Sequence, residues 1–401
     1  MTKLTLEDIK KARDIIKNIV KKTDILESTK LSDLTGANIY YKCENLQKTG
    51  SFKIRGACNK IANLTEEEKS KGVIASSAGN HAQGVALGAK MNGIEATIVM
   101  PQTAPLAKVT ATKSYGANVV LEGLVYDDAY AKAVELQKES GATFLHPFND
   151  EYVMAGQGTI ALEIFEQMNN KVDTILCPIG GGGMIAGISV AAKALNPNVK
   201  IIGVQTSNIP SMYESVRLGR VTTAFKSTSV ADGISVKTVG DLTFNIVRNL
   251  VDEIVLVDED EIAEGLLFLM ENQKVVAEGS GAVTTAAILS GKYTPKENEN
   301  VVCIISGGNI DVNTLSKIIG KALIKSGRRF SFNTEIQDKP GGLAELTKIL
   351  SGLDANIITA NLSSTNDLGK LNAYMVMETF DHEHIEKIKK AIMEAGFQIK
   401  Y

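Results

Sequence analysis

The stretch Thr174–Lys193, TILCPIGGGGMIAGISVAAK, decides the fold class of this chain. Its first part, 174–178, is apolar and typical of a buried strand, and a helix is expected over 183–193. Four consecutive glycines, Gly180–Gly183, lie between them, and ordering so many glycines costs backbone entropy unless a group must approach the main chain closely. A glycine-rich turn that opens a helix is typical of a phosphate site. The stretch therefore predicts an α/β fold with a phosphate at this turn.

The same turn also fits the dinucleotide-binding pattern in its GxGxxA form, through Gly181, Gly183 and Ala186. That pattern needs an acidic residue about 20 positions later, which holds the ribose. The next predicted strand instead ends at Gln205-Thr206, without a carboxylate, and no GKS or GKT follows the glycines. The sequence therefore favours a phosphate other than that of a dinucleotide or a nucleoside triphosphate.

Strand and helix patterns alternate on both sides of this stretch. The other strand-like segments are 38–43, 73–76, 95–99, 118–121, 143–145, 200–204, 253–257 and 301–305. Helical patterns cover 4–22, 53–63, 81–91, 105–115, 126–140, 260–271 and 281–289. Such alternation predicts parallel sheet built from βαβ units.

Three further clusters of polar and small residues lie beside predicted strands. In 51–56, SFKIRG, the apolar neighbours Phe52 and Ile54 predict a partly buried Lys53 that can act as an amine nucleophile. In 76–81, SSAGNH, the amides of a helix start could hold a carboxylate. The segment 306–309, SGGN, follows a strand end, where ligands bind in open α/β sheets. Each cluster alone could equally be ordinary: a surface lysine, a capped turn and a glycine turn.

Near Lys325 the pattern changes. Residues 326–329 are expected to form a linker, and 330–401 follow the order strand, helix, strand, strand, helix, strand, which is ferredoxin-like. We expect a domain over 1–325, with a small subdomain at about 50–145 inserted in it, and a second domain over 328–401. An exposed edge or face of the second sheet predicts pairing with another copy, and hence a homo-oligomer, either a dimer or a tetramer.

Composition limits the classes of function. Apolar residues make up 44% and charged residues 22% of the 401 residues, which is typical of a soluble globular protein. The formal net charge of −3 does not favour a nucleic-acid partner. No apolar run approaches the roughly 20 residues that cross a bilayer, and the N-terminal segment does not have the pattern of a signal peptide. We expect a cytoplasmic protein without a membrane partner, and the scattered cysteines and histidines predict no metal site.

Taken together, SFKIRG, SSAGN with His81, the glycine turn and SGGN resemble the fold-type II pyridoxal-phosphate enzymes, whose core is similar to the β-subunit of tryptophan synthase. Over about 5–325 the chain resembles the threonine dehydratases (threonine ammonia-lyases). The segment 338–343, DKPGGL, and the order of elements around it resemble an ACT regulatory domain.

The resemblance implies a set of roles around pyridoxal 5′-phosphate. Lys53 would hold the cofactor as a Schiff base and take the substrate Cα proton, Asn80 would bond the ring hydroxyl, and Ser306 would face the ring nitrogen. The other implied cofactor contacts are Phe52, Gly180, Gly181, Gly182, Gly183, Met184, Gly233 and Glu278. The substrate carboxylate would be taken by Ser77, Ala78, Gly79, Asn80 and His81.

The implied reaction converts L-threonine to 2-oxobutanoate and ammonia, with L-serine to pyruvate as a secondary activity. A serine at the ring nitrogen makes the ring a weaker electron sink than a carboxylate would, which favours elimination over transamination. Related serine racemases have a serine where this chain has Ala78, so alanine disfavours racemisation. They also bind a divalent ion through carboxylates after the strand that matches 200–204. No carboxylate lies there in this chain, so we predict no divalent metal, while a monovalent cation held by carbonyls stays open.

The ACT resemblance implies allosteric control by a small molecule, which we expect to be an amino acid. Its expected site is Pro340, Gly341, Gly342 and Leu343 against Asn356 and Ile357 of a partner copy. The identity of the effector stays open, and so does whether it inhibits or activates the enzyme. The sequence also does not decide whether threonine or serine is the preferred substrate, or whether the role is biosynthetic or catabolic. Two alternatives remain: a serine racemase, serine dehydratase or β-replacement synthase of the same fold, and a non-catalytic amino-acid sensor.

Overall fold

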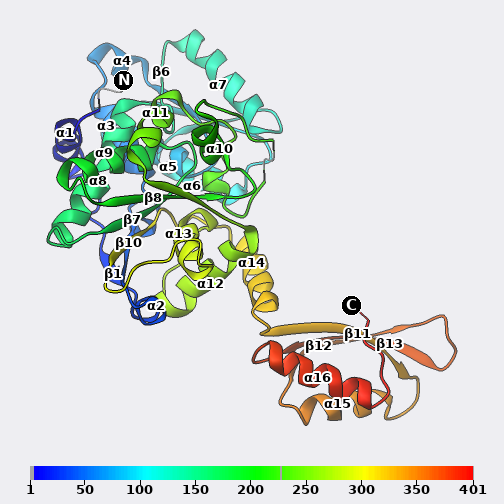
Figure 1. Cartoon of the computed structure of the whole chain (residues 1–401). Coiled ribbons are helices and arrows are strands. Elements are labelled where there is room, and N and C mark those ends of the chain that lie inside the picture. The colour runs from blue at the N-terminus through cyan, green and yellow to red at the C-terminus, as the bar shows by residue number, and fades with distance from the viewer. Residues whose placement is uncertain (1–3, 226–227, 401) are drawn as a thin grey trace. The chain divides into compact units, whose positions relative to one another are not determined.

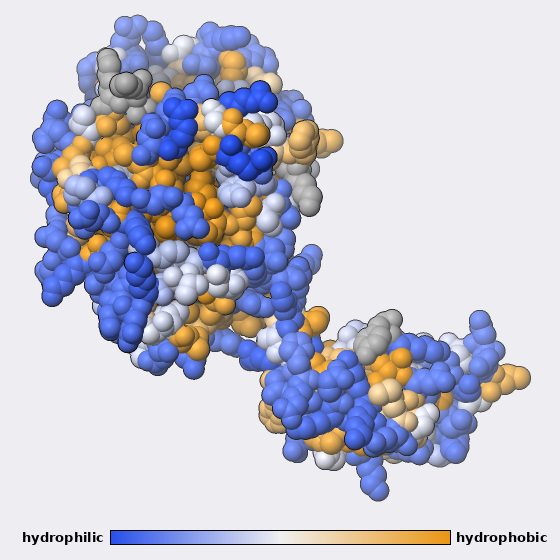
Figure 2. Space-filling model, in the orientation of Figure 1, coloured by the Kyte–Doolittle hydropathy of each residue, from blue (hydrophilic) through white to orange (hydrophobic). Residues whose placement is uncertain are grey.

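The computed structural model in Figure 1 describes residues 4–225 and 228–400. The chain divides into two compact units, Met1–Asp311 and Val312–Tyr401. Hydrophilic side chains cover most of the view in Figure 2, with apolar side chains gathered in patches between them. Within the described ranges, none of the helices combines the length and the apolar character that crossing a membrane requires.

The first unit contains a six-stranded sheet in the order β1-β2-β10-β7-β8-β9. Its strands are β1 (Ile25–Glu27), β2 (Asn38–Cys43), β7 (Thr174–Pro178), β8 (Lys200–Thr206), β9 (Glu253–Val257) and β10 (Asn300–Ile305). All neighbours pair in parallel except β1 and β2. Strands β7 and β10 are almost wholly buried, which explains their continuous apolar runs.

A second, four-stranded parallel sheet has the order β5-β4-β3-β6. Its strands are β3 (Val73–Ser76), β4 (Ala96–Met100), β5 (Asn118–Leu121) and β6 (Thr143–Phe144). All four come between β2 and β7 in chain order. The unit therefore has one wholly parallel and one mainly parallel sheet. The C-terminal end of every parallel strand is followed by a turn or loop that can carry site residues.

Helices cover both sheets (Figure 1). They are α1 (Leu6–Ile16), α2 (Thr29–Thr35), α3 (Lys53–Ala62), α4 (Glu66–Lys71), α5 (Asn80–Met91), α6 (Leu106–Ser114), α7 (Tyr126–Ser140), α8 (Glu151–Gln167), α9 (Gly183–Leu195), α10 (Ser211–Leu218), α11 (Asp241–Leu250), α12 (Glu259–Phe268) and α13 (Gly279–Leu289). Short helical turns are η1 (Glu44–Leu46), η2 (Asp232–Ile234) and η3 (Leu269–Gln273). The first helix ends at Ile16, earlier than the predicted range of 4–22.

The core of this unit is built on α8 and α9. Every residue from Val153 to Phe165 of α8 is buried. A Cβ on Gly187 of α9 would collide with the carbonyl of Met154 and lie 2.7 Å from the amide nitrogen of Gly158. Glycine at this crossing therefore lets the two backbones approach closely, and α9 is held with its first turn, which follows the glycines, at the end of β7.

The second unit begins with α14 (Val312–Lys325) and continues with β11 (Arg329–Gln337), α15 (Gly342–Ser351), β12 (Asn356–Ser364), β13 (Lys370–Glu378) and α16 (His382–Glu394). The antiparallel sheet has the order β11-β13-β12. Figure 1 shows α15 and α16 on one face of it, where Phe332, Leu346, Met375 and Ile388 share a core. The predicted last strand, 398–401, is reduced to one bridge between Asn333 and Lys400, and Tyr401 lies outside the described residues.

Candidate active site

A cleft of about 990 Å³ lies in the first unit, where residues after several parallel strands come together. Segments after β3, β6, β7 and β10 all contribute to its walls, as expected at the C-terminal ends of strands. The predicted cofactor and substrate residues all line this one cleft: Phe52, Lys53, Ser77, Ala78, Gly79, Asn80, His81, Gly180, Gly181, Gly182, Gly183, Met184, Gly233, Glu278 and Ser306. Segments that lie as far apart in the sequence as Phe52 and Ser306 thus meet around a single cavity.

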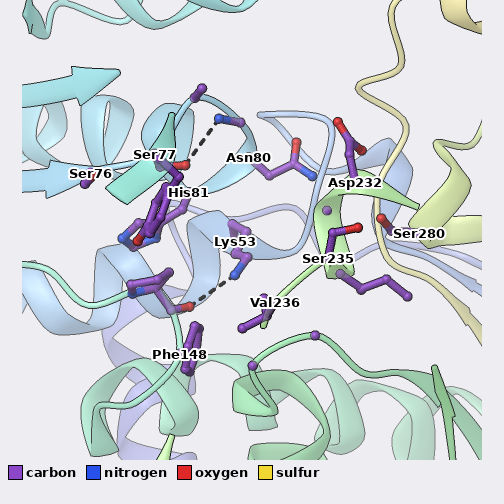
Figure 3. Close-up of a pocket in the computed structure, with 18 of the residues that line it drawn as sticks. Lys53, Ser76, Ser77, Asn80, His81, Phe148, Asp232, Ser235, Val236 and Ser280 are labelled. Atoms are coloured by element: carbon purple, nitrogen blue, oxygen red, sulfur yellow. Dashed lines mark hydrogen bonds between the residues drawn. The ribbon is translucent and has the colours of Figure 1, made fainter. Parts of the chain in front are cut away.

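Lys53 is the first residue of α3, and its side chain reaches the middle of the cleft (Figure 3). The Nζ atom donates a hydrogen bond to the carbonyl oxygen of Pro147 at 3.1 Å and lies 5.2 Å from the centre of the Phe52 ring. Burial lowers the pKa of Lys53 to about 8, although the nearby Glu278 carboxyl opposes that change. A much larger fraction of this amine is therefore neutral near pH 7 than in an exposed lysine, which favours its action as a base or nucleophile.

Asn80, which is partly exposed, and the buried Glu278 form a polar pair at one side of the cleft. Asn80 Nδ2 donates to Glu278 Oε1 at 2.8 Å, and Glu278 is only 5% exposed. Burial, with a smaller contribution from Asp232, raises the pKa of Glu278 to about 7. A Cβ on Gly233 would lie 3.2 Å from Glu278 Oε1, so the glycine leaves room for this carboxyl group.

The loop Ser77–His81 leads from β3 into α5. Ser77 Oγ accepts a hydrogen bond from the Gly79 amide at 3.2 Å, which shapes the turn. His81 Nε2 lies 2.9 Å from the Leu145 carbonyl oxygen, and because a carbonyl only accepts, this nitrogen carries the proton. Burial and the charge of Lys53 lower the pKa of His81 to about 3. The imidazole is therefore neutral at physiological pH and braces the loop.

The glycine turn forms a cradle at the N-terminus of α9. Gly182, the N-cap, has φ +92°, a conformation that side chains other than glycine rarely adopt. A Cβ on Gly180 would lie 3.0 Å from Ile234 Cα, and a Cβ on Gly183 would lie 2.9 Å from Phe148 Cα. No side chain therefore covers the backbone at the start of α9, and the unpaired amides of this first turn are accessible to an anion.

Two hydroxyl groups of the cleft support a polar ligand. Ser76 Oγ and Ser280 Oγ are buried and have no hydrogen-bond partner among residues 4–225 and 228–400. Ser306 Oγ makes only a long bond of 3.3 Å to the Ser280 carbonyl. Buried polar atoms without partners are costly, so these hydroxyls fit a ligand that carries polar atoms of its own. The glycine cradle, the amine of Lys53 and these hydroxyls together fit the predicted phosphate-bearing cofactor.

Several residues of the cleft were not predicted from the sequence. His146, Pro147 and Phe148 follow β6, so the rule that ligands gather at strand ends could have pointed to them. Figure 3 shows Phe148 below Lys53, and Ser235 and Asp232 on the side opposite His81. Asp232, Ser235, Val236 and Ser280 belong to no motif, and within 232–236 the resemblance pointed to Gly233 alone.

The segment after β8 has an internal role. Gln205 Oε1 accepts hydrogen bonds from the amides of Met212 and Tyr213, both at 3.1 Å, and its Nε2 donates to Ser211 Oγ at 3.3 Å. The amide side chain thereby satisfies the first turn of α10. Over residues 4–225 and 228–400, no three His, Cys, Asp or Glu side chains are grouped so that they could hold a metal ion.

The predicted effector residues occupy opposite ends of the sheet in the second unit. Pro340, Gly341, Gly342 and Leu343 lie just after β11, whose last residue, Gln337, pairs with Lys370. Asn356 and Ile357 begin β12, where Asn356 pairs with Glu378 at the other end of β13. One copy of the chain therefore does not bring the two groups together.

Comparison with known proteins gives consistent matches. Residues 16–307 match the family described as "Pyridoxal-phosphate dependent enzyme", and residues 331–397 match the ACT domain. The L-threonine ammonia-lyase of Thermotoga maritima is 52% identical over 400 residues, 99% of each chain. Maize serine racemase aligns with a TM-score of 0.76 and 38% identity over 81% of this chain and 99% of its own. Threonine deaminase isoform 2 of Solanum lycopersicum has a TM-score of 0.75 and 39% identity over 80% of this chain and 87% of its own.

These matches confirm the resemblance drawn from the sequence, the fold class and pyridoxal phosphate as the cofactor. The family match covers both sheets of the first unit and the whole cleft, and the ACT match runs from the third residue of β11 to beyond the end of α16. The chain belongs to the family of pyridoxal-phosphate-dependent enzymes and carries a C-terminal ACT domain.

Proposed function

We propose that this protein is an L-threonine ammonia-lyase, which converts L-threonine to 2-oxobutanoate and ammonia. The observation that carries the proposal is the Lys53 amine, with a pKa lowered to about 8, in a cleft between an anion cradle and the Ser77–His81 loop. The names of full-length relatives from Thermotoga maritima and Geobacter sulfurreducens, 52% and 45% identical, support it.

The proposed roles follow from the positions of the residues. The amides of Gly180–Gly183 and Met184 hold the phosphate, and those of Ser77–His81 hold the substrate carboxylate. When bound, pyridoxal phosphate supplies the electron sink that stabilises a negative charge at the substrate Cα. Lys53 Nζ takes the Cα proton, and the β-hydroxyl group leaves with a proton as water. Water is added again when ammonia is released, so the overall reaction is balanced.

The test is to incubate the purified holoenzyme with L-threonine and to follow 2-oxobutanoate and ammonia. Equal amounts of both products support the proposal. Racemisation is the second candidate, because maize serine racemase is a close structural match. The same assay with L-serine separates the two, since pyruvate indicates elimination, which we expect as a secondary activity, and D-serine indicates racemisation. Binding of amino acids without any product would support the sensor function.

We also propose that the ACT domain binds an amino-acid effector between two copies of the chain, and that the protein is a homo-oligomer. The effector residues lie at opposite ends of one sheet, so an antiparallel arrangement of two sheets would place Pro340–Leu343 of one copy near Asn356 and Ile357 of the other. Isothermal titration with branched and hydroxylated amino acids tests the effector, and sedimentation tests the oligomer. No heat with any of them, or a monomer, would argue against this proposal.

The glycine cradle leads to a first prediction. Gly182→Ala should weaken pyridoxal-phosphate binding about tenfold or more, because a left-handed alanine costs about 1–2 kcal/mol and its Cβ would lie 2.9 Å from Thr243 Cβ. Fluorescence titration of the apoprotein measures the dissociation constant. Gly219→Ala is the matched control, since Gly219 has φ +69° but no atom within 4 Å of a Cβ. Similar affinity for pyridoxal phosphate in both variants would contradict the proposal that the glycine turn binds the phosphate.

The buried Glu278 leads to a second prediction, on pH. Its folded-state pKa of about 7 lies above the unfolded value, so its favourable contribution is present at low pH and is lost as pH rises through 7. Glu278→Gln removes this loss. From pH 5 to pH 8 the free energy of unfolding of the variant should therefore rise relative to the unmodified apoprotein by about 2–3 kcal/mol, as measured in urea.

The control for this experiment is Glu335→Gln in the second unit. Hydrogen bonds from Lys400 and Lys370 lower the pKa of Glu335 to about 2, so its titration is complete below the range studied. Its variant should show no change in relative stability between pH 5 and pH 8. If the relative stability of Glu278→Gln were also unchanged between pH 5 and pH 8, the Glu278 carboxyl would not be held in its neutral form.

A further inference from the structure

We propose that Asn309 is a positioning residue that fixes the direction of the Asn80 side-chain amide, so that Asn80 presents its NH₂ group to Glu278 and to the cofactor. Asn309 lies in the loop after β10, and Asn80 opens α5 and lines the cleft. The inference rests on the proposed cofactor-binding role of Asn80, and it adds a residue to which neither the motifs nor the resemblance gives a role.

A chain of three hydrogen bonds carries the proposal. Asn309 Nδ2 donates to the Thr49 carbonyl oxygen at 2.7 Å and to Asn80 Oδ1 at 2.8 Å. Asn80 Nδ2 then donates to Glu278 Oε1 at 2.8 Å. These hydrogen bonds join the segment just before Lys53, the start of α5 and the start of α13, which are distant in sequence.

The donor-to-acceptor direction of these three hydrogen bonds is set by the Thr49 carbonyl. The Thr49 carbonyl can only accept a hydrogen bond, so the NH₂ group of Asn309 must face it. The second hydrogen of that group then points to Asn80, which must present its oxygen. If Asn309 turned over, its oxygen would face the Thr49 oxygen, and if Asn80 turned over alone, two NH₂ groups would face each other. Since the two ends of an amide have nearly the same shape, only these partners decide between them.

The backbone around Asn309 holds it in place. The Gly308 amide donates to the Gly50 carbonyl at 2.9 Å, and a Cβ on Gly50 would lie 3.1 Å from Asn309 Nδ2. The loop after β10 is therefore packed directly against the segment that leads into Lys53. As a consequence, Asn80 Nδ2 keeps one hydrogen after its bond to Glu278, and that hydrogen can be donated to the ring hydroxyl of the cofactor.

The test uses the holoenzyme of Asn309→Asp, which keeps the shape but cannot donate to Thr49 or Asn80. Asn80 should then turn its NH₂ group to the new carboxylate and its oxygen to Glu278. The other charged groups near Glu278 are Lys53, Asp232 and Lys108. We expect a shifted visible absorption spectrum of the bound cofactor, a titration of that spectrum displaced to higher pH, and a kcat about tenfold lower, the effect of one lost hydrogen bond.

The matched control is Asn249→Asp on α11. Asn249 also donates from Nδ2 to a backbone carbonyl, that of Asn245 at 2.7 Å, but it is exposed. Its variant should keep the spectrum, the titration and kcat. The visible spectrum requires only bound cofactor and tests the inference on Asn309. Turnover of L-threonine by the unmodified enzyme tests the proposed reaction, so the two can fail separately.

A double variant separates positioning from general damage. In Asn309→Asp with Glu278→Gln, the new glutamine can donate to the reversed Asn80, so thermal stability should recover towards that of Glu278→Gln alone. The altered spectrum should persist, because Asn80 remains reversed. If the aspartate variants fail to fold, Asn309→Ala releases Asn80 without adding charge and should give a smaller shift of the same kind. An unmodified spectrum and pH titration in the folded variant would overturn the proposal.

Discussion

Replacing Lys53 by alanine is expected to lower the turnover of L-threonine by at least about a thousandfold, since the same amine is proposed to hold the cofactor and to take the Cα proton. The variant should nevertheless fold. Burial lowers the pKa of Lys53 to about 8, which means that the folded protein destabilises the charged amine relative to water, although that form still predominates at pH 7. Removing the side chain therefore removes a destabilising charge, and the loss of activity can be attributed to chemistry.

The measurement is 2-oxo acid release by the purified variant supplied with pyridoxal phosphate, together with its visible absorbance. Lys60→Ala is the matched control, because Lys60 lies on the same helix, over the ring of Tyr152 at 5.0 Å, and pairs with Asp150 at 2.8 Å. It should keep its turnover. If Lys53→Ala retained a tenth of the activity, another residue would have to be the base, and the proposed mechanism would be wrong.

The second large effect is expected on stability. Arg55 is fully buried two residues after Lys53, and it pairs with Glu44 at 2.8 Å and with Glu163 at 2.7 Å. Lys42, also buried, pairs with Glu163 at 2.6 Å, so the cluster contains two cations and two carboxylates. Arg55→Met leaves the buried carboxylate of Glu44 without its ion pair, while the hydrogen bond from Thr23 remains. We expect the free energy of unfolding to fall by about 3–5 kcal/mol, as measured in urea.

Two further variants test the cause of that loss. Adding Glu44→Gln to Arg55→Met restores the balance of charge, because the Lys42–Glu163 pair remains, and should recover a large part of the stability. Arg217→Met removes an exposed ion pair with Glu214 and should leave the free energy of unfolding nearly unchanged, because solvent screens such a pair. If the double variant were no more stable than the single one, lost packing rather than unpaired charge would explain the effect.

The cluster around Arg55 also explains how the position of Lys53 is held. Arg55 donates from the first turn of α3 to Glu44 in η1 and to Glu163 in α8. Both partners belong to elements that carry no motif. The tertiary structure therefore fixes the first turn of α3, and with it the amine, through a network that sequence patterns did not reveal.

Much of the sheet structure could be predicted from sequence patterns. The predicted bounds of β2, β3, β5, β7 and β9 are those observed, since short apolar runs between turns are a strong local signal. Helix α8 was missed, because residues 153–165 are buried all round and leave no amphipathic stripe to recognise. The last strand, predicted over 398–401, is only a bridge at Lys400, since four residues of alternating polarity do not reveal whether they find a partner strand.

The sequence by itself determined the local chemistry of this protein: a bare glycine turn before a helix, a lysine between apolar neighbours, and small polar groups after strands. These features depend on residues close together in the chain. Only the tertiary structure decided which of them meet, because Lys53 reaches Pro147, Asn309 reaches Asn80, and Arg55 reaches Glu163 across long stretches of sequence. It also decided the pKa values of Lys53 and Glu278, since burial, which sets them, is a property of the packed molecule.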